Sequence, residues 1–435
     1  MSSSVTGTPT AEGAEEPALE VGPDLASRYR SVRAFTERLC DPLSPEDCTV
    51  QSMEEASPAK WHLAHTSWFF ETLLLEREAP GYRPFEPRFR LLFNSYYNSV
   101  GEQYARPKRG LLTRPTLEQV FAYRAHVDRH VLAVLAKGPD LAAEVAEFVE
   151  LGLHHEQQHQ ELILTDIKHV LAQNPLHPAY HDRPVEPANE PDPLRWHGYD
   201  EGLHWIGHDG RSFSFDSERP RHRAFVHAFE LGSRPVTNGE FLEFVEDGGY
   251  ERSEHWLSDG WALVQRERWQ VPLYWQGRDG DRSVVTLAGL RELSAHEPVS
   301  HVSYYEADAF ARWAGARLAS EAEWEIAASQ APIQGNFVES GRLHPAAATG
   351  SGDPPLQLFG DVWEWTSSAF APYPGYRPLT GALGEYNGKF MCNQLTLRGG
   401  SCATSRSHIR STYRNFFFPD ARWQFSGIRL ARDAA

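Results

Sequence analysis

The sequence predicts two domains of different class, a helical bundle followed by an α+β domain dominated by loops. Two observations indicate this division. Apolar residues recur at helical spacing up to about residue 172. After a proline-rich stretch, glycines, prolines and tryptophans are scattered and the expected strands are short. A chain of 435 residues is long enough to give both domains substantial cores.

The expected boundaries follow the composition. Residues 1–24 are rich in Ser, Thr, Gly, Ala and Glu and lack an apolar core after a basic start, so we expect a disordered tail rather than a signal peptide. We assign 25–173 to the helical bundle, 174–194 to a polar, proline-rich linker, and 195–435 to the α+β domain.

The first domain is expected to hold four helices, near residues 25–39, 57–71, 116–136 and 141–171. Ser57 is predicted to be the N-cap of the second helix, with Pro58 in its first turn. Asn174-Pro175 ends the fourth helix. A four-helix bundle is the architecture that this pattern favours. In the second domain only two helices are expected, 238–246 and 304–315, and Trp363 and Trp365 are expected to be core residues.

Charge and cysteine usage exclude several classes of function. The net charge is −17 and there is no long basic run, which argues against nucleic acid or an anionic membrane as the main partner. No apolar stretch approaches the roughly 18 residues that a membrane helix needs. The four cysteines form neither a zinc-type pair nor a disulfide framework, which predicts a protein of the reducing cytoplasm.

A histidine pair predicts a metal site in the bundle. His155 and His159 are four residues apart on the last helix, so their side chains lie on one face and can bind one divalent ion. The third ligand is expected from the second helix, which carries His62 and His65. Three histidines leave coordination positions open, and an open metal site is typical of catalysis.

Two other interpretations of the pair remain open at this point. His155-Glu156-Gln157-Gln158-His159 matches the zinc-protease motif H-E-x-x-H, but the position six residues further, where the extended motif has a histidine, is Thr165. The histidines would alternatively be surface residues of an amphipathic helix.

The second domain resembles a known family. The motifs that carry the resemblance are Pro298-Val-Ser-His, Arg317-Leu-Ala-Ser-Glu-Ala-Glu-Trp-Glu, Gly360-Asp-Val-Trp-Glu-Trp, Arg398-Gly-Gly-Ser and Gly427-Ile-Arg429. Together they resemble the formylglycine-generating/sulfatase-modifying domain, a variant of the C-type lectin fold. The copper-binding cysteine pair of true formylglycine generators has no equivalent, since 403–414 contains no cysteine, which argues against that activity.

The whole chain after about residue 25 resembles the ergothioneine-biosynthetic sulfoxide synthases (hercynine oxygenases). The resemblance rests on a DinB-like bundle with Trp61-His-Leu-Ala-His65 and His155-Glu-Gln-Gln-His159, joined to the domain above. It implies a non-haem iron(II) enzyme that uses dioxygen to join a thiol to the imidazole carbon of hercynine, forming a sulfoxide. The implied iron ligands are His65, His155 and His159, with His62 as a packing or supporting residue.

The resemblance also implies substrate-binding residues. Gln158 and Asn415 would bind hercynine, and Phe416 and Phe417 would face its trimethylammonium group. In mycobacterial-type members two positions bind a γ-glutamyl group, and in this chain they are occupied by Phe417 and Ala421. The chain is therefore similar to the type that uses free cysteine.

A loop of the first domain completes the expected site. Arg106 and Arg109 would bind the cysteine carboxylate, and Tyr96 or Tyr97 would donate to the iron–oxygen intermediate. The expected partners are therefore hercynine, cysteine and dioxygen.

Several points stay open from sequence alone. The thiol donor could be γ-glutamylcysteine, a related enzyme could use histidine or a selenium donor, and the chain could instead be a metal-free binding module with a lectin-like half. The oligomeric state and the acting tyrosine are also undetermined.

Overall fold

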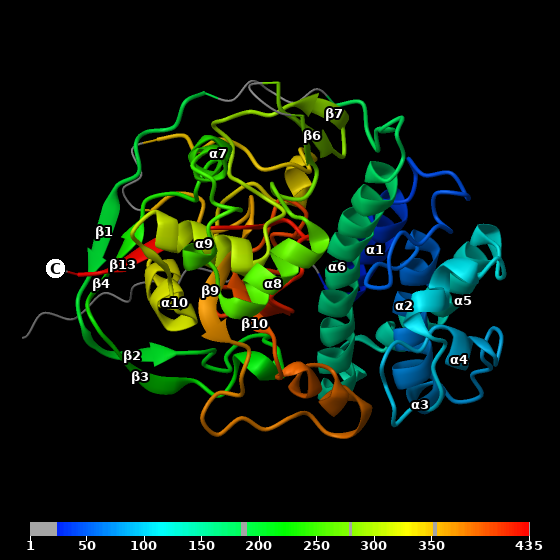
Figure 1. Cartoon of the computed structure of the whole chain (residues 1–435). Coiled ribbons are helices and arrows are strands. Elements are labelled where there is room, and N and C mark those ends of the chain that lie inside the picture. Colours follow the sequence, from blue (N-terminus) through cyan, green and yellow to red (C-terminus); the bar gives the residue numbers. More distant parts are fainter. Residues whose placement is uncertain (1–23, 184–188, 278–280, 351–354, 435) are drawn as a thin grey trace, which may run out of the picture.

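The computed structural model describes residues 24–183, 189–277, 281–350 and 355–434. The predicted tail, apart from Asp24, and residues 184–188 of the predicted linker lie outside the described residues. As predicted, helices dominate the first part and a mixed α+β arrangement forms the second (Figure 1).

Helix α6 stands between the other helices of the first part and the second part (Figure 1). Helix α2 contacts both α5 and α6, and α1 packs on α6. A π-helical turn, Glu71–Leu75, continues α2. The helices are α1 (Leu25–Arg38), α2 (Ala59–Phe70), α3 (Glu76–Glu78), α4 (Phe89–Leu92), α5 (Leu117–Leu135) and α6 (Ala143–Ala172).

The start of α2 differs from the prediction. Pro58, not Ser57, is the N-cap, and no side chain caps the helix. The Ser57 hydroxyl instead accepts a hydrogen bond from Arg109. The backbone carbonyl of Cys48 takes over part of the capping, because it accepts a hydrogen bond from the Lys60 amide.

A glycine allows α2 and α6 to approach closely. A Cβ atom on Gly152 of α6 would lie 2.4 Å from Cε1 of Phe70 on α2. Only a residue without a side chain therefore leaves room for the Phe70 ring at this helix crossing. The close approach brings the histidine faces of the two helices together.

The second part contains four small sheets in the described residues. Their strand orders are β1-β4-β13-β8, β11-β10-β9-β12, β2-β3 and β5-β6-β7, and the pairing is antiparallel except between β9 and β12. The strands are β1 (Trp196–Tyr199), β2 (Gly202–Ile206), β3 (His222–Val226), β4 (Phe229–Gly232), β5 (Trp275–Gln276), β6 (Ser283–Thr286), β7 (Gly289–Glu292), β8 (Arg317–Leu318), β9 (Trp363–Ala369), β10 (Leu395–Arg398), β11 (Asn415–Phe417), β12 (Ser426–Gly427) and β13 (Leu430–Asp433).

The second part has more helices than predicted. The expected helices are α7 (Asn238–Glu246) and α9 (Tyr304–Trp313), but α8 (Ser258–Glu267) and α10 (Glu321–Ser329) are also present, so the prediction of only two helices is wrong. Helices α8 and α10 are only two to three turns long, so the apolar residues in each are too few to show a helical periodicity. The capping box of α10, Ser320 with Glu323, was nevertheless visible in the sequence.

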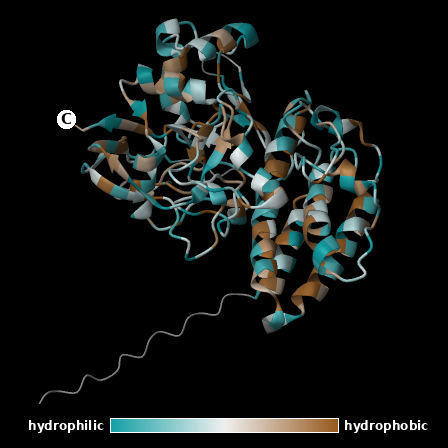
Figure 2. Cartoon of the chain, turned by 90° about the horizontal axis from the view of Figure 1, so that it is seen from below, coloured by the Kyte–Doolittle hydropathy of each residue, from teal (hydrophilic) through white to brown (hydrophobic). Residues whose placement is uncertain are grey.

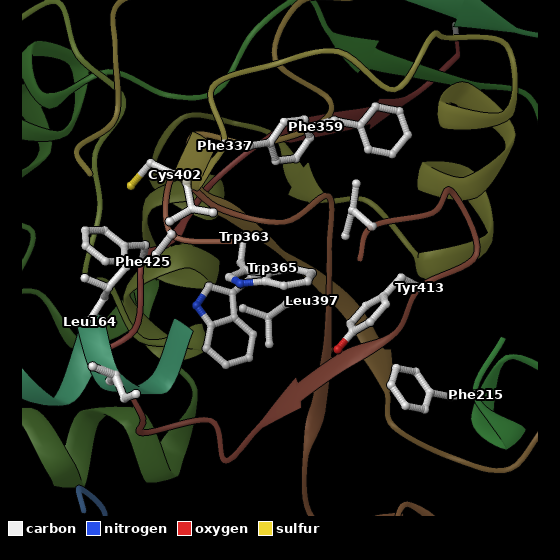
Figure 3. Close-up of a cluster of buried hydrophobic side chains, with 14 of the residues drawn as sticks. Leu164, Phe215, Phe337, Phe359, Trp363, Trp365, Leu397, Cys402, Tyr413 and Phe425 are labelled. Atoms are coloured by element: carbon white, nitrogen blue, oxygen red, sulfur yellow. The ribbon is translucent and has the colours of Figure 1, made fainter. Parts of the chain in front are cut away.

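The core of the second part surrounds Trp363 and Trp365, each 1% exposed, as expected (Figure 3). Leu164 of α6 lies in the same cluster, so the helical part contributes directly to this core (Figure 3). Brown and teal segments alternate along the helices in Figure 2, as expected for helices with one buried face. All four cysteines are free thiols. Among the described residues no helix has the length and hydropathy required to span a membrane.

Candidate metal centre

Three histidines from two helices converge in the bundle. His65 comes from α2, and His155 and His159 come from consecutive turns of α6. Each offers one ring nitrogen, and these three atoms lie within 4.8 Å of one another. The Nε2 atoms of His155 and His159 are 3.1 Å apart. Two imidazole nitrogens at about 2 Å from one metal ion lie roughly 3 Å apart, so this spacing suits a shared ion.

The ring of His65 is oriented for metal binding. Its Nδ1 donates to the backbone carbonyl of Phe93 at 2.7 Å, which leaves the lone pair on Nε2. That Nε2 atom is buried and has no hydrogen-bond partner among the described residues. A buried, unpaired acceptor is costly unless a cation or donor occupies the space before it. The residues therefore fit a divalent metal ion.

The histidines are held in the neutral form that metal binding requires. Burial lowers the pKa of His155 to about 3. Burial and the neighbouring imidazoles also hold the pKa values of His65 and His159 well below their ordinary range. Neutral rings keep a lone pair for a metal at physiological pH.

Glu156 excludes the protease and surface interpretations of the motif. Its carboxylate is fully buried, accepts hydrogen bonds from Arg33 and Thr36 of α1 and Arg124 of α5, and does not line the cavity beside the histidines. A zinc protease would need this carboxylate beside the metal as a general base. His155 and His159 are also buried, so they are not surface residues.

A large cavity opens beside the histidines. Its volume is about 1720 Å³, and both parts of the chain line it. Among the lining residues are His155, Gln158 and His159 of α6, Tyr96, Arg106 and Arg109 of the loop before α5, and Tyr386, Tyr413, Asn415, Phe416 and Phe417 of the second part. The structure thus brings nearly all residues of the predicted site to one cavity.

Arg109 is a buried cation in this cavity wall. Its guanidinium lies 3.4 Å above the Trp61 ring, and Trp61 in turn stacks on His65. Burial, and then the charge of Arg106, lower the pKa of Arg109 to about 8. Arg109 forms no ion pair within the described part of the chain, and its Nε has no hydrogen-bond partner there. Arg106 is more exposed and donates to the backbone carbonyl of Glu55.

The two predicted tyrosines occupy different positions. Their rings stack with centroids 4.7 Å apart. Tyr96 lines the cavity, whereas Tyr97 lies behind it, fully buried against Trp68 and Phe69. Burial raises the pKa of Tyr96 above the ordinary value of a phenol, so its hydroxyl keeps its proton.

The imidazole-binding candidates lie across the cavity. Gln158 accepts a hydrogen bond from the Tyr386 hydroxyl and donates one to the Tyr413 hydroxyl at 2.7 Å. Asn415 is half-buried at the cavity wall. Phe416 stacks on Phe370, with ring centroids 4.1 Å apart, and more loosely on Phe390, with centroids 5.8 Å apart.

Phe417 packs against Trp423, which the sequence analysis did not predict to be near the site. It lies edge-on to Trp423, with centroids 5.5 Å apart. Both rings line the cavity, and Phe417 packs partly against the core.

Sequence reasoning missed Tyr386 and Tyr413. Tyr386 lies 5.6 Å from the ring of His155, centroid to centroid, and only 3% of it is exposed. It belongs to an irregular segment after a short 3-10 turn, so no periodicity indicated its direction. Asp166, two turns after His159, was also missed. It accepts hydrogen bonds from His62, Ser57 and Trp423.

Comparisons with known proteins agree with this architecture. Residues 28–163 match the model of the DinB superfamily, and residues 201–353 and 356–434 match that of the sulfatase-modifying factor enzyme 1-like domain. Hercynine oxygenase from Mycobacterium tuberculosis is 33% identical over 436 residues, covering 94% of this chain and 98% of that protein. The hercynine oxygenase of Mycolicibacterium thermoresistibile is 31% identical and covers 94% and 95%.

A more distant relative matches only in part. Ergothioneine biosynthesis protein 1 of Schizosaccharomyces pombe is 26% identical over 51% of this chain and 28% of its own length. The two hercynine oxygenases, by contrast, match along almost the whole of both chains. The chain belongs to the hercynine oxygenase family.

Proposed function

We propose that this protein is a non-haem iron(II), dioxygen-dependent sulfoxide synthase of ergothioneine biosynthesis. It joins cysteine to the imidazole carbon between the ring nitrogens of hercynine and gives hercynylcysteine sulfoxide. The observation that carries the proposal is the convergence of His65, His155 and His159 beside a cavity lined by both domains. Full-length similarity to proteins named hercynine oxygenase supports it.

The reaction balances without a further reductant. One C–H bond of hercynine and the S–H bond of cysteine are replaced by a C–S bond, and the sulfur gains one oxygen. The other oxygen atom of dioxygen leaves as water with the two hydrogens. Iron(II) held by three neutral imidazoles would supply open positions for dioxygen and the thiolate. The protein must then orient two substrates against each other.

Arg109 is the proposed anchor for the cysteine carboxylate. A buried guanidinium without an anionic partner favours an anionic ligand, and a carboxylate can accept two of its hydrogen bonds. Arg106, at the outer side of the cavity, is the proposed second donor. The stack of Arg109, Trp61 and His65 keeps this anchor next to the metal centre.

Gln158 and Asn415 are the proposed partners of the hercynine imidazole. Gln158 already binds two tyrosine hydroxyls, which fixes its amide plane. One of its N–H groups and one oxygen lone pair remain for a ligand. Phe416 and Phe417 are proposed to contact the trimethylammonium group through the parts of their rings that line the cavity.

Tyr96 is the proposed proton donor. It is the tyrosine of the adjacent pair that lines the cavity, and burial keeps its phenol protonated. A phenol beside the reacting oxygen can deliver a proton before a second oxygen atom adds to sulfur. Without that donor, thiol dioxygenation to cysteine sulfinic acid is the competing outcome.

A product assay tests the proposal. Anaerobically purified protein is loaded with iron(II), then supplied with air, hercynine and either cysteine or γ-glutamylcysteine. We expect the cysteine adduct sulfoxide, and loss of both product and bound iron in His155→Ala. A clear preference for γ-glutamylcysteine would contradict the donor assignment, and turnover by His155→Ala without bound metal would contradict the metal centre.

A further inference from the structure

One hydrogen-bond chain leads from the metal centre to a buried carboxylate. The Nδ1 atoms of His159 and His62 are 2.7 Å apart, and Nε2 of His62 lies 3.1 Å from Oδ2 of Asp166. All three side chains are at least nine-tenths buried. His62 and Asp166 lie outside the set of three histidines that can share a metal ion.

The partners of Asp166 fix the direction of this chain. Its Oδ2 accepts a hydrogen bond from the Ser57 backbone N–H at 2.8 Å, and its Oδ1 accepts one from Nε1 of Trp423 at 3.1 Å. An amide N–H and an indole N–H can only donate, so both carboxylate oxygens act as acceptors. The remaining partner, Nε2 of His62, must then donate its proton to Asp166.

The polarity of His62 determines the tautomer of His159. With its proton on Nε2, a neutral His62 has only a lone pair on Nδ1. The facing Nδ1 of His159 must therefore carry the proton and donate it to His62. The lone pair of His159 is then on Nε2, the atom that faces His155.

From this geometry we propose that Asp166 is a positioning residue of the metal centre. Through His62 it holds the proton of His159 on Nδ1 and so leaves Nε2 free to bind the metal. The role rests on the proposed metal site, and it assigns to His62 the part of a relay rather than of a ligand. Asp166 is held from both domains, by Ser57 before α2 and by Trp423 of the second part.

The first test needs no substitution of the relay. Nitrogen-15 spectra of histidine-labelled, metal-free protein distinguish the two neutral tautomers of each imidazole, and the His159 signals are assigned by their loss in His159→Ala. We expect His159 protonated on Nδ1 and His62 on Nε2. A His159 proton on Nε2 would overturn the proposal.

A double-mutant cycle on metal affinity gives the second test. Cobalt(II) is titrated into metal-stripped wild type, Asp166→Leu, His62→Leu and the double variant, and binding is followed by absorbance. Loss of such a supporting partner lowers metal affinity by about 10–100-fold. Because both residues act through one chain, we expect the double variant to lose no more than either single variant.

Controls separate the relay from the metal site itself. Glu161→Gln removes a half-buried carboxylate of α6, one that accepts hydrogen bonds from Ser401, Thr404 and Trp363. We expect its cobalt affinity to stay within about twofold, while His155→Ala loses binding. Wild-type affinity in Asp166→Leu, or additive losses in the double variant, would refute the relay. Unchanged affinity in His155→Ala would instead refute the proposed metal site.

Discussion

Replacing Glu156 by glutamine tests how much the buried ion pairs of α6 stabilise the helical bundle. The carboxylate is fully buried and accepts hydrogen bonds from Arg33, Arg124 and Thr36 at 2.7–2.9 Å. Burial alone would raise its pKa, but the two guanidinium charges and the hydrogen bonds outweigh burial and lower the pKa from 4.5 to about 2. Each pKa unit corresponds to about 1.4 kcal/mol, so ionised Glu156 stabilises the fold by about 3 kcal/mol at pH 7.

The lowered pKa of Glu156 also determines how its contribution to stability changes with pH. A carboxyl whose pKa is lowered in the folded state stabilises fully above its unfolded pKa, about 4.5, and loses this contribution as the pH falls toward 2. At pH 3 the contribution is about 1.4 kcal/mol. Glu156→Gln should therefore lower the free energy of unfolding by about 3 kcal/mol at pH 7 and by less than half of that at pH 3. The loss at pH 7 is close to the 3–5 kcal/mol typical of breaking a buried ion pair.

Urea unfolding of metal-free protein, followed by circular dichroism at both pH values, measures these differences. Glu150→Gln is the matched control, because Glu150 lies on the same helix and pairs with Arg28 at a partly exposed site. Surface pairs contribute less than about 1 kcal/mol, so little change is expected there. If the difference in unfolding free energy between wild type and Glu156→Gln is the same at pH 7 and pH 3, the reasoning is refuted.

Three further predictions concern the cavity and the helix crossing. Arg109→Gln should raise the KM for cysteine by at least tenfold and leave that for hercynine within about twofold, since one charge-assisted hydrogen bond is worth about 1.5–3 kcal/mol; equal effects on both constants would argue against a carboxylate anchor. Tyr96→Phe should divert product from sulfoxide to cysteine sulfinic acid, measured as a product ratio, with a smaller change in Tyr97→Phe and the largest in the double variant; wild-type sulfoxide formation by the double variant would exclude both phenols. Gly152→Ala should cost about 1–3 kcal/mol in urea unfolding, because its Cβ would overlap the Phe70 ring; unchanged stability would show that α2 can move aside freely.

Sequence periodicity predicted the elements that depend only on the spacing of residues close together in the chain. The four long helices of the first part and the pairing of His155 with His159 follow from spacing along one helix. Motif resemblance, not periodicity, indicated His65 rather than His62 as the third converging histidine, and the structure brings His65 to the pair.

The remaining parts depend on contacts between distant segments. Asp166 approaches His62 across 104 residues, and Gln158 meets Tyr413 across 255. The capping of α2 by the Cys48 carbonyl, which displaced Ser57, is a backbone contact that no side-chain pattern reveals. Residues such as Tyr386 carry no local signal, because only tertiary packing gives them a direction.

Helix α6 packs into the cores of both domains. Its Leu164 fills the tryptophan core of the second part, and Glu161 and Lys168 bind Ser401 and His301 there. A fragment that ended after α6 would expose an apolar side chain together with a carboxylate and an ammonium group that have lost their partners. Such a fragment should aggregate. The DinB-like half of this chain is therefore not a transplantable module, since α6, which carries His155 and His159, also packs into the neighbouring domain.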